Sequence, residues 1–391
     1  MQTQGISSTC GGDVPPQAPS EDDLQAHWRR VVGRRSFLKG VGLAGAAALP
    51  GSALLADSAL ARAGTLSDGD VAVLRLLAAI ELIESDLWQQ YNELGGVKGG
   101  NPSYIAALSN LDSDMPQYIA DNTDDELSHA SFLNAYLRFK GAHPVNLDEF
   151  RTLPSSEAKG ARRVGRLTNL MKLDVDTSWY VRYRSPRNPD LGARFPQAVT
   201  IKGEPAIPLN DHDTPPGLPA PVPPKGRHER RMQAIANTAG FHFAYIEQGG
   251  SSLYSIMALK VTSLEVLRII VSIGGVETNH FSLWHDKAGN AVAQPLAGVT
   301  DPVSGLHFPD LNARGGQLNQ TNLILPEPTQ FLHRSLPPVS IVRPTRDHLG
   351  GALATIKSFT ADRLFEGQST KFFRTVHDLA RRADAAHRGA V

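Results

Sequence analysis

The sequence is poor in cysteine, in net charge and in long apolar runs, and each shortage excludes a class of protein. Its one cysteine, Cys10, lies in an N-terminal segment that we expect to be removed, which leaves nothing for disulfides, zinc fingers or iron–sulfur clusters. Basic and acidic residues number 39 each, so no net field attracts nucleic acid, and we expect no nucleic-acid partner. Any metal must therefore be bound by carboxylates and imidazoles.

The N-terminal segment predicts export. Residues 33–40, GRRSFLKG, place adjacent arginines before a weakly apolar run rich in Gly and Ala, and small residues at 59–63 offer a cleavage site. The pattern resembles a twin-arginine signal, which predicts a periplasmic or secreted protein. The alternative, a basic patch before a buried helix or membrane anchor, fits less well because the run is short and contains Pro50. We expect no transmembrane segment in the mature chain, since no later run is long and apolar enough.

Four segments of the mature chain have the apolar periodicity and the end signals of long helices. Ser67 with Asp70, and Thr262 with Glu265, have the spacing of capping boxes. The sequence therefore predicts an all-α fold built from two helical hairpins with a long insertion between them. We expect its helices at about residues 67–95, 114–141, 229–260 and 262–289.

The second and fourth predicted helices repeat one motif, a glutamate three residues before a histidine: Glu126 with His129 and Glu277 with His280. Helical stepping places both pairs on the apolar stripe that faces the core. A buried carboxylate is costly unless it is neutralised, paired or bound to a metal. One such motif is weak evidence, because the spacing is common on solvated helix faces, but two in matching positions indicate a shared site.

The first and third predicted helices supply further carboxylates on their inward stripes, either Glu81 or Glu84 on the first and Glu247 on the third. Glu247 and Glu277 lie at similar depth, roughly 20 Å from the turn between their helices at about 1.5 Å per residue, so they can face each other. Four carboxylates and two imidazoles on four helices are a known ligand set for two iron or manganese ions. Such a centre keeps positions open for dioxygen, peroxide or water.

At these motifs the chain resembles the ferritin-like superfamily, most closely the exported bacterial ferritin-like domain family that includes desiccation-related proteins. ELIESDLW at 81–88 is similar to the first helix of that family, and DDELSHASFLNAYL followed by HPVNLDEF is similar to the second. Residues 241–257 and 276–287 are similar to its third and fourth helices. The resemblance covers about 65–150 and 228–290.

This resemblance implies a ferritin-like four-helix bundle with a dimetal centre of two Fe or Mn ions. In the first helix Glu81 matches the glutamate of the family, while Glu84 shares the inward stripe, so both stay candidates. The other implied ligands are Glu126, His129, Glu247, Glu277 and His280.

The remaining segments divide the chain around the two hairpins. In the insertion, TSWYVRYR at 177–184 and ARFPQAVTI at 193–201 have strand-like composition around a turn, which predicts a β-hairpin before a proline-rich linker. Two further helices are expected near 346–366 and 369–387. The predicted parts are a signal peptide at 1–63, the first hairpin at 64–150, the insertion at 151–227, the second hairpin at 228–290 and a C-terminal extension at 291–391.

Several other residues near the motifs have ordinary structural interpretations. Glycine pairs at 249–250 and 274–275 favour close helix crossing over extra room for a small oxidant or a helix bulge. We interpret three aromatic residues as core packing rather than redox relays, and two histidines as satisfied or exposed rather than ligands: Trp88, Tyr91, Tyr254, His242 and His285.

These features favour an exported dimetal protein with oxidoreductase chemistry on dioxygen or peroxide. The alternative is a non-catalytic stress, desiccation-related or interaction protein that keeps the same bundle. Iron storage in a hollow cage fits less well, because the insertion and the C-terminal extension would obstruct shell packing. Assembly into a homo-oligomer is compatible with each of these functions.

Overall fold

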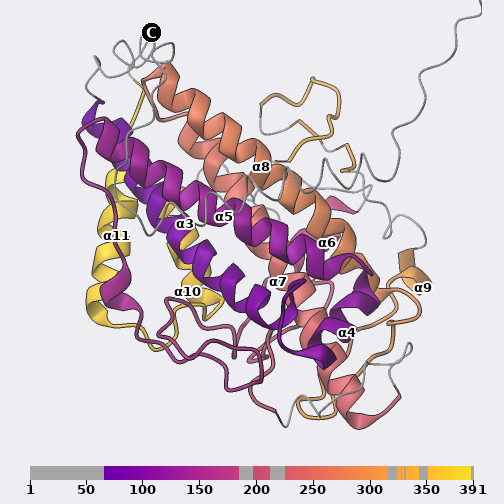
Figure 1. Ribbon diagram of the computed structural model, residues 1–391. Coiled ribbons are helices and arrows are strands. Elements are labelled where there is room, and N and C mark those ends of the chain that lie inside the picture. The colour runs from indigo at the N-terminus through magenta and orange to yellow at the C-terminus, as the bar shows by residue number, and fades with distance from the viewer. Residues whose placement is uncertain are drawn as a thin grey trace, which may run out of the picture. The chain divides into compact units, whose positions relative to one another are not determined.

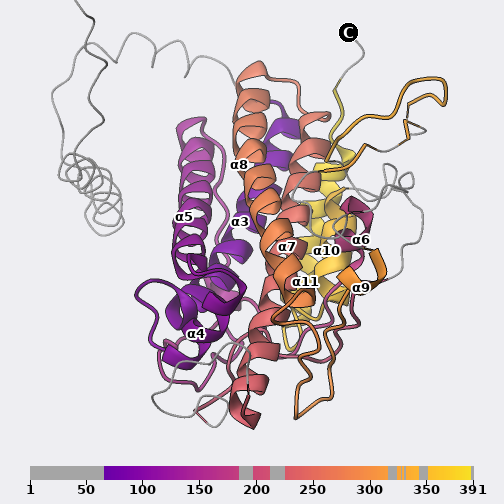
Figure 2. The same cartoon turned by 90° about the vertical axis from the view of Figure 1, so that its right-hand side faces the viewer.

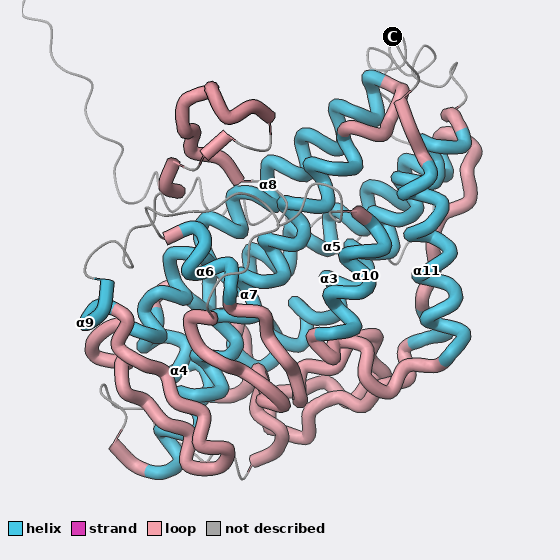
Figure 3. The backbone as a smooth tube through the Cα atoms, turned by 180° about the vertical axis from the view of Figure 1, so that it is seen from behind, coloured by secondary structure: helices cyan, strands magenta, loops and turns pink. Residues whose placement is uncertain are grey.

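The computed structural model is helical in the part of the chain that it describes. Loops connect the helices, and extended pairing among the described residues is limited to isolated bridges (Figure 3). No helix among these residues is long and apolar enough to cross a membrane. The predicted export signal and most of the proline-rich linker lie outside the described residues, which are 66–184, 197–211, 225–315, 324–326, 328–329, 332–342 and 351–388.

Four long helices lie side by side and enclose the core (Figures 1 and 2). α3 packs against α5 and α7 packs against α8, so the two predicted hairpins are present. Each helix lies within a few residues of its predicted limits. The four helices are α3 (Asp68–Gly95), α5 (Met115–Phe139), α7 (Arg227–Ala258) and α8 (Leu264–Ala288).

The predicted capping box of α3 is half present. Ser67 Oγ accepts a hydrogen bond from the Asp70 backbone N–H at 3.0 Å, as expected of an N-cap. The Asp70 carboxylate, however, does not turn back to Ser67 but accepts bonds from the backbone N–H and hydroxyl of Thr262, each at 2.8 Å. Asp70 therefore joins the start of α3 to the turn before α8, where the helix dipole favours a negative charge.

The predicted capping box of α8 is displaced by one residue. Ser263, rather than Thr262, is the N-cap, and its hydroxyl accepts from the Val266 N–H at 3.4 Å. Glu265 forms an ion pair with Lys140 at the end of α5, with 2.8 Å between Nζ and Oε2. The Thr262 hydroxyl instead donates a hydrogen bond to Asp70 at the start of α3.

A short helix that the sequence analysis did not predict, α4 (Pro102–Leu111), connects α3 to α5 and packs against α7. Asn101 is its N-cap and accepts from the Tyr104 N–H at 3.1 Å, with Pro102 in the first turn. An Asn–Pro pair before an apolar segment is a recognisable start signal, and it was present in the sequence.

The predicted β-hairpin of the insertion is wrong in its first limb, where residues 178–183 form the short helix α6 (Ser178–Tyr183). Trp179, Tyr180 and Tyr183 are buried there, and Trp179 lies 5.8 Å from Phe241 of α7 between ring centroids. Aromatic composition indicates burial as well as strand, and contact with α7 selects a helical turn. The described residues of the second limb, 197–201, are not in a strand, and the turn lies outside the described residues.

Another part of the insertion, at residues 151 and 167–168, is held against α3 by contacts to the buried carboxylate of Asp86. Asp86 accepts from the backbone N–H groups of Leu167 and Thr168, at 3.0 and 2.9 Å, and from the Thr168 hydroxyl at 2.8 Å. Arg151 pairs with the other carboxylate oxygen at 2.6 Å. The insertion is thus part of the packed structure beside the first hairpin.

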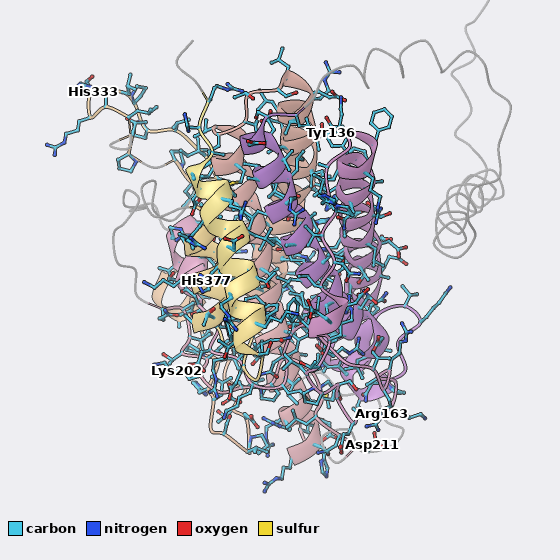
Figure 4. All side chains as sticks on the ribbon, turned by 90° about the vertical axis from the view of Figure 1, so that its left-hand side faces the viewer. Tyr136, Arg163, Lys202, Asp211, His333 and His377 are labelled. Atoms are coloured by element: carbon cyan, nitrogen blue, oxygen red, sulfur yellow. The ribbon has the colours of Figure 1, made fainter. Side chains whose placement is uncertain are left out.

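Both predicted C-terminal helices are present and lie beside the long ones. α11 packs against α3, and the stick view from that side, where His377 is labelled, shows side chains filling the space between the helices (Figure 4). The shorter elements are α9 (Asn312–Gly315), α10 (Ala352–Ala361), α11 (Thr370–Ala385) and the 3-10 turns η1 (Asp148–Phe150) and η2 (Gly289–Val292).

Candidate metal centre

Six acidic and histidine side chains from the four long helices converge at one buried point. They form two overlapping groups of four, and within each group one ligand atom from every residue lies within 4.8 Å of the others. Each of the six residues is at most 7% exposed. The first group is Glu81, Glu126, His129 and Glu277, and the second is Glu126, Glu247, Glu277 and His280.

Helical geometry explains why the two motifs meet. Glu126 and His129 lie one turn apart on α5, on the stripe that also buries Ile119 and Leu133. Glu277 and His280 occupy the equivalent stripe of α8, on the C-terminal side of the buried Ile270 and Ile273. Apolar residues on either side of each motif therefore hold the polar pairs at the centre of the core, as the sequence predicted.

In the first group, one imidazole nitrogen faces three carboxylates. His129 Nδ1 lies 3.3 Å from Glu81 Oε2, 3.2 Å from Glu126 Oε2 and 3.4 Å from Glu277 Oε1. A single Nδ1–H can donate to only one of these oxygens at a time. The arrangement is the one expected if three carboxylates and a histidine surround a cation.

In the second group, the histidine is held from both sides. His280 Nδ1 lies 3.1 Å from Glu126 Oε1 and 3.2 Å from Glu247 Oε2. Its Nε2 lies 3.2 Å from Asp125 Oδ2, whose side chain is 44% exposed. Asp125 thus fixes the ring with Nδ1 turned inward, as outer carboxylates do for metal-bound histidines. The sequence analysis missed Asp125, although it directly precedes Glu126.

Burial and mutual repulsion strongly perturb the carboxyl groups. Burial raises the pKa of Glu81 from 4.5 to about 7. Burial and the neighbouring Glu126 carboxylate raise the pKa of Glu277 well above its usual range. Burial would also raise the pKa of Glu126, but hydrogen bonds from His129 and His280 hold it below its usual range. Without a metal, the cluster must therefore share protons among its members.

The pKa values of both histidines in the cluster are raised, which is opposite to the effect of burial on an isolated imidazole. Burial alone would lower the pKa of His129 and of His280, yet the surrounding carboxylates raise both above the usual value. With both imidazoles protonated, the four carboxyl groups of the two groups still carry more potential negative charge than the imidazoles offset. Either protons on some carboxyl groups or bound cations in their place can neutralise the cluster.

The two candidate glutamates of α3 have different positions. Glu81 belongs to the first group of ligand atoms, whereas Glu84 does not. Glu84 is nevertheless buried, neither of its carboxylate oxygens has a hydrogen-bond partner among the described residues, and burial with the nearby Glu277 raises its pKa well above the usual range. Glu84 therefore lies beside the cluster rather than among its converging groups.

Two further side chains support the cluster. Asn122, one turn before Glu126, donates from Nδ2 to Glu126 Oε1 at 2.9 Å and to Glu247 Oε1 at 3.1 Å. Tyr254 of α7 donates its hydroxyl hydrogen bond to Glu81 Oε1. Helical stepping places Asn122 on the same inward face of α5 as Glu126, but its contact to Glu247 on another helix depends on the fold.

The glycine pairs allow close approach, as predicted, through one member of each pair. A Cβ at Gly250 would overlap the carboxylate of Glu277 on the facing helix. A Cβ at Gly274 would lie 2.8 Å from Tyr254 Cβ, whereas one at Gly275 would meet nothing within 4 Å. Gly250 therefore makes room for one of the converging glutamates, and α7 and α8 continue through both pairs as α-helix.

The two other histidines differ from each other. His242 is buried and satisfied, because its ring nitrogens contact Tyr91 and Asp362. His285 is buried with neither ring nitrogen hydrogen-bonded among the described residues, so the prediction that it is satisfied or exposed is wrong. Aromatic rings surround it, including Trp179 at 5.6 Å, and burial lowers its pKa well below the usual value, which keeps it neutral.

The donor set fits hard or borderline divalent cations. Carboxylate oxygens and imidazole nitrogens suit iron and manganese, and Glu126 and Glu277, which belong to both groups, stand where they could bridge two ions. The cluster lies nearest to solvent where His129, His280 and Asp125 carry its residual exposure. Comparisons of the chain with protein-family models, with curated proteins and with solved structures find no match.

Proposed function

We propose that the four long helices are a ferritin-like bundle holding two iron or manganese ions, and that the protein carries out oxidoreductase chemistry with dioxygen or peroxide. The observation that carries this proposal is the pair of overlapping ligand groups, which share Glu126 and Glu277. Glu81 and His129 would complete one position, and Glu247 and His280 the other. The proposed location, periplasmic or secreted through a twin-arginine signal, rests on the sequence pattern of residues 33–63 alone.

The residues themselves set the conditions for that chemistry. Four carboxylates would balance two divalent ions, and such an anionic ligand set favours higher oxidation states over lower ones. When bound, the ions would supply electron transfer and open coordination positions for a small oxidant. Asp125 and Asn122 would hold His280, Glu126 and Glu247 in their orientations, while the apolar stripes exclude bulk water.

The test combines metal analysis with oxidant consumption. Purified metal-free protein is titrated with Fe²⁺ or Mn²⁺, and we expect about two ions per chain, followed by consumption of dioxygen or peroxide by the reduced form. Glu247→Gln should slow consumption more than it lowers the unfolding temperature, and Glu265→Gln, which changes an ion pair with Lys140 away from the cluster, is the matched control. Failure to bind either ion would overturn the proposal. Tight binding without reaction towards either oxidant would favour the non-catalytic stress protein.

A further inference from the structure

A chain of contacts leads from the metal ligands into the aromatic core. Asn122 bonds two ligand carboxylates through Nδ2, and its Oδ1 accepts from the Trp284 indole N–H at 2.8 Å. One side chain therefore connects Trp284 to both Glu126 and Glu247. Trp284 is fully buried, so this indole is held against the centre without access to water.

From Trp284 the contacts continue through stacked rings. Trp284 and Trp88 stack with centroids 5.4 Å apart and an angle of 23° between their planes. The centroid of Trp88 lies 5.7 Å from that of Tyr91, and Phe243 packs against all three rings. Electrons pass between such closely packed aromatic rings far more readily than through the same distance of aliphatic core.

The chain ends at a base suited to accept the phenolic proton of Tyr91. The Tyr91 hydroxyl lies 2.7 Å from His242 Nδ1, and His242 Nε2 lies 3.1 Å from Asp362 Oδ2. The carboxylate accepts from Nε2–H, which leaves Nδ1 as the acceptor for the hydroxyl. All three side chains are at most 2% exposed. Packing alone does not require a histidine–carboxylate pair there, because burying such a pair is costly.

Three other buried tyrosines, Tyr104, Tyr245 and Tyr254, lack this combination. The Tyr104 hydroxyl donates to the Ala206 carbonyl, and the Tyr245 hydroxyl contacts the Ser358 hydroxyl, neither of which takes a proton readily. Tyr254 does face a carboxylate, Glu81, but under the proposed function that carboxylate would bind a metal ion. Tyr91 is therefore better placed than these three tyrosines to lose an electron and a proton together.

We propose that Tyr91 is a redox-active tyrosine connected to the dimetal centre through Trp88 and Trp284. In this step an oxidising metal ion at the centre gains one electron, Tyr91 loses it, and the phenolic proton moves to His242 Nδ1. The products are the ion reduced by one charge, a neutral tyrosyl radical and an imidazolium ion stabilised by Asp362. The proposal rests on the proposed function, because the dimetal centre would supply the oxidant. It identifies Tyr91 as the residue on which one oxidising equivalent would be stored.

The first experiment observes the radical directly. Protein loaded with Fe²⁺ is mixed with hydrogen peroxide, frozen rapidly and examined by electron paramagnetic resonance. We expect a radical signal that narrows when the protein is made with ring-deuterated tyrosine and that is absent from Tyr91→Phe. His242→Gln, which keeps a hydrogen-bond acceptor but no base, should lose the signal as well. Tyr183→Phe, a buried tyrosine whose ring packs against Phe281 rather than against the rings of this chain of contacts, is the matched control and should keep it.

The second experiment tests the route without metal. Metal-free protein carrying Trp28→Phe and Trp179→Phe retains Trp88 and Trp284, and a light flash ionises these indoles. We expect the tryptophanyl absorption to decay as tyrosyl absorption rises, at a rate independent of protein concentration, and only when Tyr91 is present. Circular dichroism of each variant verifies that it is folded.

These two experiments separate the inference from the proposed function. Absence of transfer in the folded metal-free protein would overturn the role of Tyr91 whether or not metal binds. A signal unaffected by Tyr91→Phe in protein that binds and oxidises iron would overturn it too. Failure to bind iron is read separately by metal analysis and would overturn the proposed function, while flash-induced transfer to Tyr91 would still support the aromatic route.

Discussion

The two hairpins contribute the same motif to the cluster but support it in different ways. On α5, the Nδ1 of His129 faces Glu81, Glu126 and Glu277. On α8, His280 faces Glu126 and Glu247 from inside and Asp125 from outside. The repeated motif thus provides two candidate metal positions with similar ligands. The residues that contact the histidine differ between the two positions.

The helices behind the motifs differ as well. α3 faces the cluster with two carboxyl groups one turn apart, Glu81 and the unpartnered Glu84. α7 faces it with Glu247 and then Gly250, whose missing side chain leaves space for Glu277. One hairpin therefore carries an extra buried carboxyl group beside the cluster, and the other carries a glycine whose missing side chain leaves the space that the Glu277 carboxylate occupies.

The largest effect should come from the carboxylates common to both groups. Glu126→Gln should abolish binding of both ions at concentrations that saturate the wild type, because an amide cannot replace a bridging anion. Glu247→Gln should remove one ion of the two. Glu84→Gln should keep both, since Glu84 lies outside the groups. Metal stoichiometry by mass spectrometry or atomic absorption distinguishes these results.

Equal losses from Glu126→Gln and Glu247→Gln would contradict the two-position arrangement. Loss of an ion in Glu84→Gln, with none lost in Glu81→Gln, would exchange the roles of the two α3 glutamates. Sequence reasoning could not make that choice, because both lie on the inward stripe of one helix. The position of α3 along the axis of α5 decides which of the two carboxylates reaches His129. That position depends on packing over the whole hairpin.

The local sequence pattern was sufficient to predict much of the remaining structure. The long helices and the two histidine motifs follow from periodicity within a few turns, and each lies where the sequence predicted it. Asp70 could not be understood locally, since its partner Thr262 is 192 residues away. α6 was misassigned because the aromatic residues that suggest a strand are buried against α7 instead.

The second-largest effect should follow from filling the space at Gly250. Gly250→Ala should displace the Glu277 carboxylate, weaken metal binding and lower stability by about 1–3 kcal/mol, the usual cost of overpacking. Gly275→Ala is the matched control on the facing helix, where nothing lies within 4 Å. It should stabilise the helix by up to about 1 kcal/mol. Chemical denaturation with and without metal measures both, and equal behaviour of the two variants would refute the special role of Gly250.

A smaller, pH-dependent effect should distinguish metal-free from metal-loaded protein. The pKa of Glu81 rises from 4.5 to about 7 on folding, so the folded state holds its proton longer than the unfolded state does. The stability that this group contributes is present below pH 4.5 and is lost as the pH rises through about 7. Metal affinity should increase over the same interval, because the cation displaces that proton.

Thermal unfolding across this pH range checks the expectation. Glu81→Gln should flatten the slope of the metal-free protein, because the amide does not titrate. Glu265→Gln should leave that slope unchanged. A slope that persists in Glu81→Gln would show that another acid controls it, and Glu84, whose pKa is also raised by burial, would be the next residue to change.

The smallest effect should come from Asp125, whose carboxylate contacts His280 from outside the cluster. Among the described residues, no such outer carboxylate contacts His129. Asp125 is half-exposed, so water competes for its hydrogen bond to His280 Nε2 and its contribution is reduced. Asp125→Asn should weaken the ion on the His280 side by about tenfold, the low end for outer carboxylates of metal-bound histidines, and leave the other ion unchanged. Asp124→Asn, one residue earlier on the helix, is the control. Stepwise metal titration resolves the two affinities, and equal weakening of both ions would mean that Asp125 acts on the whole cluster through Glu126 rather than on His280.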